Sequence, residues 1–192
     1  MANTTSIMLA GVGGQGTILA SRILAQLLLD KGYDVKMSEV HGMAQRGGSV
    51  TTQVRYGEQV DAPTIAPGQA DFILSFEAME AARTAHFLKP GGTIIANTRR
   101  IPSLPILIGK EEYPDDIDER LAERGIDVRW VDAYSIAEEL GNTRVENVVL
   151  LGAFSTVLPF TEGAWKKAIA QVVPPRHVEL NVVAFQRGSR LA

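Results

Sequence analysis

The sequence predicts an α/β fold in which a mostly parallel sheet lies between two layers of helices. Short apolar runs alternate along the chain with longer segments whose apolar residues recur at helical spacing, a pattern typical of such sheets. The first apolar run leads through a glycine-rich turn straight into a helix. From Val145 onward the pattern is helical throughout, so a helical C-terminal region is expected. A length of 192 residues predicts one domain with a sizeable core.

The N-terminal half supplies most of the predicted sheet. The helix at residues 17–31 places leucines and isoleucines on one face, and Gly32 is expected to end it. A second helix, at residues 77–88, is expected to stop at Pro90-Gly91-Gly92. Buried strands are expected at residues 6–10, 71–76 and 93–97, and a further strand is expected at residues 34–39.

The segment at residues 49–56 alternates as a half-exposed strand does. One side carries Val50, Thr52 and Val54, and the other side carries Gln53 and Arg55. Alternation of this kind indicates that one face meets water. We therefore expect this strand toward an edge of the sheet or in a hairpin.

The C-terminal half is predicted to be mainly helical. The proline-rich stretch at residues 100–114 is expected to be irregular. The apolar stretch at residues 148–160 is too short to cross a membrane and contains Ser155 and Thr156, so it is expected to form a buried helix. A strand is expected at residues 126–131, and helices are expected at 115–124, 135–140, 146–158, 161–173 and 177–187.

Composition and charge restrict the function. A formal net charge of −3 argues against a nucleic-acid-binding protein, whose surface would need to be basic. The absence of cysteine excludes disulfides, cysteine-ligated zinc or iron–sulfur clusters, and thiol catalysis from this chain. The N-terminus lacks the basic residues that begin a signal peptide. We therefore expect a cytoplasmic protein with no membrane or nucleic-acid partner.

The first glycine-rich turn joins the strand at residues 6–10 to the helix that follows it. Gly11, Gly13 and Gly16 match the pattern G-x-G-x-x-G, with Gly14 and Gln15 inside it. Such glycines allow a tight turn, close approach of a pyrophosphate to the backbone, and close packing of the helix on the strand. The N–H groups at the helix start then favour an anion. The alternative is that the glycines serve packing alone.

Glu39 keeps a dinucleotide cofactor open as a hypothesis. It ends the strand at residues 34–39, about 20 residues after the turn, where a carboxylate would hold the ribose of NAD. Under this hypothesis the chain is a stand-alone NAD(P)-dependent dehydrogenase. His41 is the one histidine close to the turn in sequence.

A second glycine-rich segment, residues 41–48, follows the same strand. It contains Gln45, Arg46 and Gly47. Ligands bind at the carboxyl ends of strands in such sheets, and a guanidinium suits phosphate or carboxylate. We therefore expect the two glycine loops to lie side by side as one recognition surface. The alternative is a surface turn in which Arg46 pairs with Glu39 or Glu77.

No complete catalytic or metal-binding set accompanies these loops in the sequence. Glu39 and His41 would give two metal ligands without a third. The sequence has neither a G-x-S-x-G nucleophile motif nor a G-x-x-x-x-G-K-[ST] phosphate loop. A binding loop without chemistry of its own is typical of one subunit of a larger enzyme. We expect no catalytic residue and no metal site on this chain.

Together the two loops resemble a known family. Residues 11–16 followed by residues 42–48 closely resemble the gamma-type domain of the 2-oxoacid:ferredoxin oxidoreductases, and within that family the indolepyruvate branch. The likeness extends to residues 147–153 and 181–188, so it covers the chain as a single gamma-type domain, residues 1–192. It implies a three-layer, Rossmann-like fold.

The resemblance also implies a function. These enzymes decarboxylate a 2-oxoacid on thiamine diphosphate, pass electrons through iron–sulfur clusters to ferredoxin, and release an acyl-coenzyme A. In the indolepyruvate branch the substrate is an aryl pyruvate. Thiamine diphosphate and the clusters are expected on a cysteine-rich alpha subunit in a hetero-oligomer, so this chain alone is expected to be inactive.

The resemblance associates the gamma-type domain with coenzyme A. The phosphates of coenzyme A would then contact Gly13, Gly14, Gln15, Gly16 and Arg46. Two alternatives stay open at this point. The loops could instead dock the alpha subunit and shape its active site, or the chain could be a pure assembly module that binds no small molecule.

Overall fold

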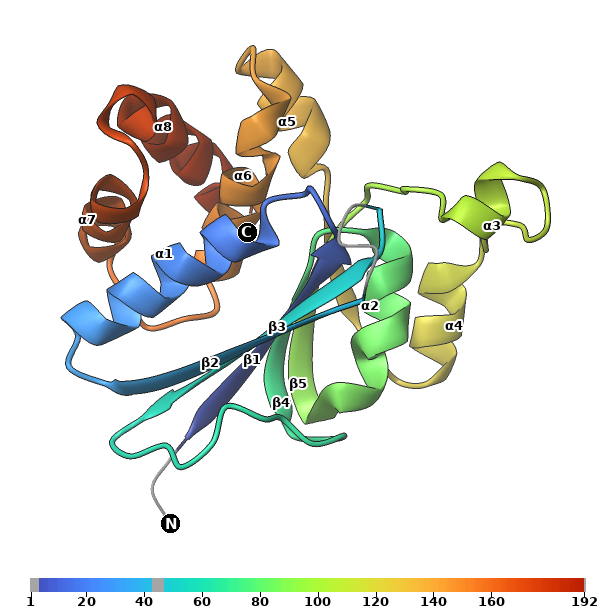
Figure 1. Cartoon of the computed structure of the whole chain (residues 1–192), viewed down its shortest axis with the longest axis horizontal. Helices are drawn as coiled ribbons and strands as arrows, with labels where there is room; N and C mark the ends of the chain where they lie inside the picture. Colours follow the sequence, from blue (N-terminus) through green and yellow to red (C-terminus); the bar gives the residue numbers. More distant parts are fainter. Residues whose placement is uncertain (1–3, 43–46, 192) are drawn as a thin grey trace.

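A six-stranded sheet forms the middle of the molecule (Figure 1). The computed structural model describes residues 4–42 and 47–191. The strands lie in the order β2-β3-β1-β4-β5-β6. Parallel pairing joins β1 (Thr5–Val12), β4 (Ala70–Ser75), β5 (Leu88–Asn97) and β6 (Val128–Val131), whereas β3 (Ser49–Gly57) runs antiparallel to both β1 and β2 (Asp34–His41). The predicted, mostly parallel sheet is confirmed.

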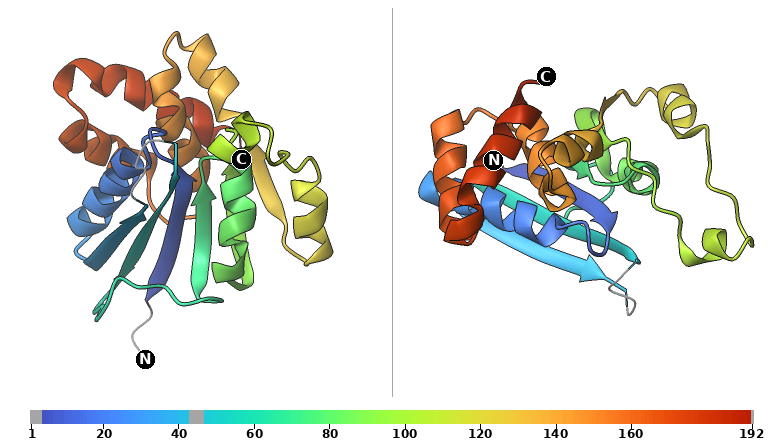
Figure 2. Two further views of the ribbon diagram at one scale, coloured as in Figure 1. Left: turned by 45° about the vertical axis from the view of Figure 1, so that its right-hand side comes forward. Right: turned by 90° about the horizontal axis from the view of Figure 1, so that it is seen from above.

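Helices cover both faces of this sheet (Figure 2). The two faces bury separate apolar clusters, so the predicted three-layer α/β fold is confirmed. None of the helices within the described residues is long and apolar enough to cross a lipid bilayer. One face carries α1 (Thr17–Asp30), α5 (Ala133–Glu139), α6 (Glu146–Ser155), α7 (Glu162–Val172) and α8 (Val178–Ser189), and the other carries α2 (Ala78–Thr84) and α4 (Ile117–Glu123).

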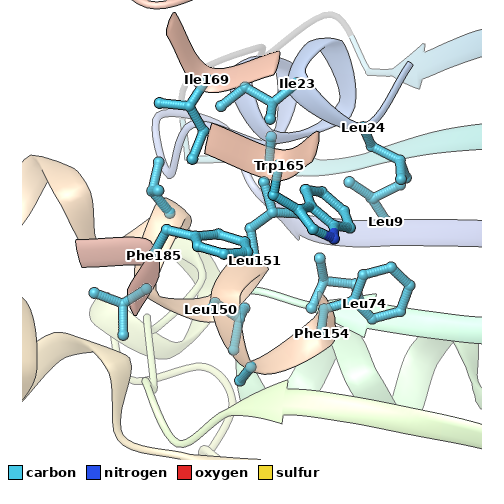
Figure 3. Packing of buried hydrophobic residues seen from close by; sticks show 14 of the residues in the cluster. Leu9, Ile23, Leu24, Leu74, Leu150, Leu151, Phe154, Trp165, Ile169 and Phe185 are labelled. Atoms are coloured by element: carbon cyan, nitrogen blue, oxygen red, sulfur yellow. The ribbon is translucent and has the colours of Figure 1, made fainter. Parts of the chain in front are cut away.

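The larger core depends on close contact between α6 and α8. A Cβ atom on Gly188 would lie 1.9 Å from the Val149 carbonyl oxygen, so the two helix backbones touch where only glycine fits. Trp165 of α7 is fully buried beside this contact, with its ring centroid 5.6 Å from that of Phe185 (Figure 3). This packing confirms a buried helix after Val145 and brings the start of α6 next to the start of α1.

The half-exposed strand is β3, and it belongs to a hairpin with β2. Its Val50, Thr52 and Val54 side chains are buried. On the opposite face Arg55 donates to the Ala62 carbonyl at 3.0 Å, and Gln53 accepts from the Ile65 N–H at 2.6 Å. The hairpin prediction is confirmed, but β2 occupies the sheet edge and β3 lies second from it.

Several predicted boundaries differ from the structure because pairing or capping overrides the helical pattern. The helix predicted at residues 77–88 ends at Thr84, a single 3₁₀ turn follows, and Leu88 already pairs with β4. Pro90-Gly91-Gly92 therefore lies inside β5, where a Cβ on Gly92 would sit 2.9 Å from the Asp71 carbonyl. Two smaller differences are α5, which begins at Ala133 rather than Ser135, and the one-turn helix α3 (Leu104–Leu107) within the stretch expected to be irregular.

Candidate functional site

The first glycine turn is shaped by the close approach of two other segments. A Cβ on Gly11 would lie 2.9 Å from Thr17 Cγ2 and 3.1 Å from Phe76 Cβ. Gly16 has a φ of +80° and forms the N-cap of α1. A Cβ there would lie 2.4 Å from Asn147 Nδ2 at the start of α6. Both positions therefore require glycine, one for packing on the strand and one for packing on α6.

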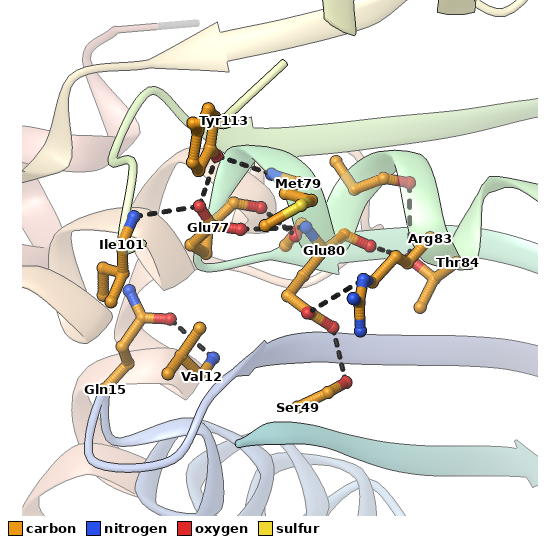
Figure 4. Close-up of polar contacts among 12 residues, drawn as sticks. Val12, Gln15, Ser49, Glu77, Met79, Glu80, Arg83, Thr84, Ile101 and Tyr113 are labelled. Atoms are coloured by element: carbon orange, nitrogen blue, oxygen red, sulfur yellow. Dashed lines mark hydrogen bonds and ion pairs between the residues drawn. The ribbon is translucent and has the colours of Figure 1, made fainter. Parts of the chain in front are cut away.

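Gln15 fastens this turn to the neighbouring strand. Its Oε1 accepts from the Val12 N–H at 2.8 Å (Figure 4). Its Nε2 donates to the Phe76 carbonyl at 2.7 Å. Both ends of the side-chain amide are thus used by the backbone where β1 and β4 end, and the side chain positions the turn. Gln15 also lines the turn cavity described below, and its contact with a ligand stays a prediction.

The two glycine loops lie side by side, as the sequence predicted. The Gly13 N–H donates to the Gly48 carbonyl at 2.9 Å, and the Gly47 N–H donates to the Gly13 carbonyl at 3.2 Å. This pair of hydrogen bonds joins the end of β1 to the start of β3. Gln45 and Arg46 lie outside the described residues, between Gly42 and Gly47.

A cavity of about 530 Å³ opens beside the first turn, and we call it the turn cavity. The segment that begins α1 lines it, and α1 has no side-chain cap among the described residues. The segment that begins α6 lines it too, but α6 continues a 3₁₀ turn (Thr143–Val145) whose start is capped by the Asn142 side chain. The positive end of α1 therefore meets this space, which favours an anion. Residues on its wall include Gly13, Gly14, Gln15, Gly16, Gly47, Arg99, Tyr134, Arg144, Glu146 and Asn147.

Two arginines add positive charge to the turn cavity. Arg99 is half-buried and lies 3.6 Å above the centre of the Tyr134 ring. Arg144 is exposed at the rim, just before α6. Within the described part of the chain neither guanidinium forms an ion pair. Both are therefore placed to pair with a phosphate or carboxylate.

Glu146 and Asn147 complete the wall at the start of α6. Burial raises the pKa of Glu146, while Asn97 donates to its Oε1 at 2.6 Å and lowers the pKa in part. Asn147 is 2% exposed and donates from Nδ2 to the Gly16 carbonyl at 3.0 Å. Its Oδ1 is buried and has no hydrogen-bond donor among the described residues. A buried acceptor without a partner is costly, but this oxygen is inaccessible to solvent, so a ligand in the cavity does not reach it in this conformation.

A second cavity, of about 630 Å³, lies on the other side of Gly47 and Ile101, and we call it the arm cavity. Its wall is acidic and apolar. Glu80 accepts from the Ser49 hydroxyl at 2.6 Å and faces Arg83 at 3.7 Å, and burial raises the pKa of Glu80. Glu77 is completely buried, and its carboxylate accepts hydrogen bonds from the Glu80 and Ile101 N–H groups and from Tyr113.

Glu39 lies apart from both cavities, exposed on the edge strand β2. In the sheet that holds a dinucleotide, the strand with the acidic residue is next to the strand of the glycine turn. Here β3 lies between them, because Glu39 pairs with Thr52 and Thr52 pairs with Leu9.

The described residues contain no group of three or more His, Cys, Asp or Glu side chains that could hold a metal ion.

The sequence missed the side chains that line the turn cavity opposite the glycines. Arg99 comes two residues after β5. Because ligands bind at the carboxyl ends of strands in such sheets, the reasoning that pointed to the glycine loops could also have pointed to Arg99. Asn147 begins one of the segments that carried the resemblance. Tyr134 and Arg144 have no comparable signal, since only the packing of the C-terminal helices brings them to the site.

Comparison with known proteins places this geometry in a family. A profile of the pyruvate ferredoxin/flavodoxin oxidoreductase family matches residues 6–191. The chain belongs to this family. It is 40% identical to indolepyruvate oxidoreductase subunit IorB of Thermococcus kodakarensis over 97% of this chain and 95% of that protein. It is 32% identical to 2-oxoglutarate synthase subunit KorC of Methanothermobacter marburgensis, over 96% of this chain and 95% of that protein.

Solved structures confirm the gamma-type fold. The gamma subunit of a keto/oxoacid ferredoxin oxidoreductase from Geobacter sulfurreducens matches with a TM-score of 0.72 and 25% identity, over 97% of this chain and 96% of that chain. A 2-oxoglutarate:ferredoxin oxidoreductase from Magnetococcus marinus, solved with 2-oxoglutarate, coenzyme A and succinyl-CoA bound, matches with a TM-score of 0.75 and 23% identity. That match covers 98% of this chain and 31% of the other chain, so the same fold there is part of a much longer polypeptide.

Proposed function

We propose that this chain is the non-catalytic subunit of a ferredoxin-linked oxidoreductase acting on an aryl pyruvate such as indolepyruvate, and that it completes the active site on the coenzyme A side. The relatives named as indolepyruvate oxidoreductase subunits, 37–40% identical, support the substrate class. The observation that carries the coenzyme A role is the turn cavity. The uncapped start of α1 and two arginines meet there beside the paired glycine loops.

The cofactors of the reaction do not fit this chain and are expected on a partner. The sequence has no cysteine, so it offers no thiolate ligand to an iron–sulfur cluster. We therefore assign the clusters to a cysteine-rich alpha subunit. The family resemblance assigns thiamine diphosphate, which supplies the carbanion chemistry of the decarboxylation, to the same subunit. The residues of this chain bind and orient coenzyme A instead.

The residues of the turn cavity suit the groups that coenzyme A carries. Its pyrophosphate and third phosphate would meet Arg99, Arg144 and the N–H groups at the start of α1. Arg46 stays a predicted contact on the neighbouring loop, together with Gly47. Gly11 stays a predicted part of the same turn, and Glu39 and Gln45 stay untested as ligand contacts.

A stand-alone dehydrogenase is disfavoured by the order of the strands. The intervening β3 moves Glu39 two strands away from the glycine turn, so it would not reach the ribose of a dinucleotide bound at Gly13. A pure assembly module would leave the two arginines without a purpose.

Reconstitution tests the proposal. The isolated chain, mixed with indolepyruvate, coenzyme A and a viologen dye or ferredoxin, is expected to give no reduction, and the alpha subunit is expected to restore turnover. In that complex Arg99→Ala with Arg144→Ala should raise the KM for coenzyme A about tenfold or more, because each charged hydrogen bond contributes about 1.5–3 kcal/mol. Subunit association should be unchanged.

The matched control is Arg22→Ala, which removes an exposed arginine from the outer side of α1. It should leave the KM for coenzyme A unchanged. Full activity of the isolated chain would contradict the subunit role. Weaker association of the double variant at unchanged KM would instead favour a docking role for the turn cavity.

A further inference from the structure

Residues 101–113 form an arm that leaves the edge of the sheet and returns to the same point. Both ends are held by one carboxylate oxygen: Glu77 Oε1 accepts from the Ile101 N–H at 3.0 Å and from the Tyr113 hydroxyl (Figure 4). Glu77 is completely buried at the N-cap of α2. A loop whose ends meet at one buried group has a fixed base.

Further contacts tie this base to the rest of the domain. The Tyr113 hydroxyl also accepts from the Met79 N–H at 3.0 Å, which links the arm to the first turn of α2. Arg100 Nη1 lies 2.6 Å from Asp115 Oδ1, and its guanidinium lies 5.3 Å from the Tyr113 ring centre. The arm is therefore held in a defined direction before any partner arrives.

The tip of the arm carries apolar side chains in water. Leu104 and Leu107 are each 68% exposed, and Ile108 is 56% exposed. The other large apolar side chains with high exposure among the described residues are spread over α1, β2, α8 and the C-terminal end. Single exposed apolar side chains are ordinary on a protein surface, but a cluster indicates a contact site.

The position of the tip shows which partner it suits. Leu104 and Leu107 line the arm cavity, which shares Val12, Gly47 and Ile101 with the turn cavity. The arm cavity and the turn cavity are therefore neighbours, so a partner that reaches the turn cavity can also contact the tip of the arm.

We propose that the arm docks its apolar tip into an apolar groove of the thiamine-bearing subunit and so holds the turn cavity against that subunit's reaction centre. This inference rests on the proposed function. The longer Magnetococcus marinus chain, in which the same fold is about a third of the polypeptide, is consistent with a domain that packs against the rest of the enzyme.

The test replaces the tip and measures association with the alpha subunit. Leu104→Ser, Leu107→Ser and Ile108→Ser together should raise the dissociation constant about tenfold or more, because the three apolar side chains would no longer bury their surface in the groove. The control is Leu29→Ser with Leu191→Ser, which removes side chains that are 54% and 50% exposed elsewhere on the surface. It should bind the alpha subunit as the wild type does. At saturating alpha subunit, the tip variant should recover the wild-type kcat and KM for coenzyme A.

The outcomes separate this inference from the proposed function. If wild-type chain and alpha subunit do not associate, or associate without turnover, the proposed function fails. If they form an active complex and the tip variant binds as tightly as wild type, the arm inference is overturned and the proposed function stands. If the isolated chain forms dimers that the tip substitutions abolish, a second copy is the occupant and the inference is likewise overturned.

Discussion

The turn cavity and the arm cavity share a wall but differ in how their polar groups are used. In the turn cavity Arg99 and Arg144 form no ion pair with described residues, and the start of α1 has no side-chain cap. In the arm cavity the carboxylates of Glu77 and Glu80 are already occupied by N–H groups, hydroxyls and Arg83. One region therefore keeps its polar groups for a ligand, while the other uses them to hold the chain.

The largest expected effect comes from replacing one glycine in each region by alanine. Gly16 beside the turn cavity and Gly109 on the arm both have positive φ, +80° and +72°. Gly109→Ala should destabilise the fold by about 1–2 kcal/mol, because an alanine there is strained but meets no neighbour. Gly16→Ala should cost about 3–4 kcal/mol, because its Cβ would also displace Asn147 and break that hydrogen bond.

Urea unfolding of the isolated chain measures this difference. Both variants place an alanine at a positive φ and so lose a similar backbone energy. The difference between their free energies of unfolding therefore measures the contact of Gly16 with α6. Equal values for the two variants would mean that α6 does not fix the turn.

The glycine turn was predictable because its causes are local. The strand, the turn from Gly11 to Gly16 and the helix are consecutive in sequence, and each glycine is required by its own backbone or by an adjacent segment. The second loop was predictable for a similar reason, since it follows β2 directly. The carboxyl-end rule then brought both loops to one edge of the sheet.

The opposite wall was not predictable because its causes are distant in sequence. Asn147 reaches Gly16 across 131 positions, and the packing of α6 against α8, α5 and α1 places it there. The same holds for the arm. Its irregular course was expected from the prolines at residues 100–114. The sequence does not indicate that Glu77 accepts hydrogen bonds from both ends of the arm.

A smaller effect tests whether the base of the arm is as fixed as its hydrogen bonds indicate. Tyr113→Phe removes the hydroxyl that joins Glu77 to the Met79 N–H, and leaves the apolar tip unchanged. We expect a loss of about 1–2 kcal/mol in the free energy of unfolding, the usual result when a buried hydrogen-bonding group loses its partner. Association with the alpha subunit should also become slower, because the arm must then be ordered during binding.

Tyr134→Phe is the matched control on the turn cavity. It keeps the ring that packs under Arg99, so stability and association should both stay within about 0.5 kcal/mol of wild type, as is usual for a surface change. Stopped-flow mixing with the alpha subunit measures the rates. An unchanged association rate for Tyr113→Phe would show that the arm keeps its direction without this hydrogen bond.

The smallest expected effect concerns the one carboxylate among the cations of the turn cavity. Burial raises the pKa of Glu146, so the folded state holds this proton more tightly than the unfolded chain does. Its ionised form therefore lowers stability at neutral pH, and this penalty disappears as the pH falls through the raised pKa. The same ionised form repels an anion bound nearby.

Glu146→Gln should accordingly tighten the binding of inorganic pyrophosphate at pH 7. Two unit charges about 6 Å apart repel by about 0.7 kcal/mol even when screened as in bulk water, so we expect a change of at least about threefold. Calorimetric titration of variant and wild type at the same pH cancels the titration of pyrophosphate itself. The ratio of the two affinities should fall toward one as the pH is lowered through the raised pKa, because wild-type Glu146 then becomes neutral.

Glu80→Gln is the matched control. Burial also raises the pKa of Glu80, but this residue lines the arm cavity, so the variant should leave the affinity for pyrophosphate unchanged. If both variants gained affinity equally, the anion would not be bound in the turn cavity specifically, and the proposed difference between the two cavities would be wrong.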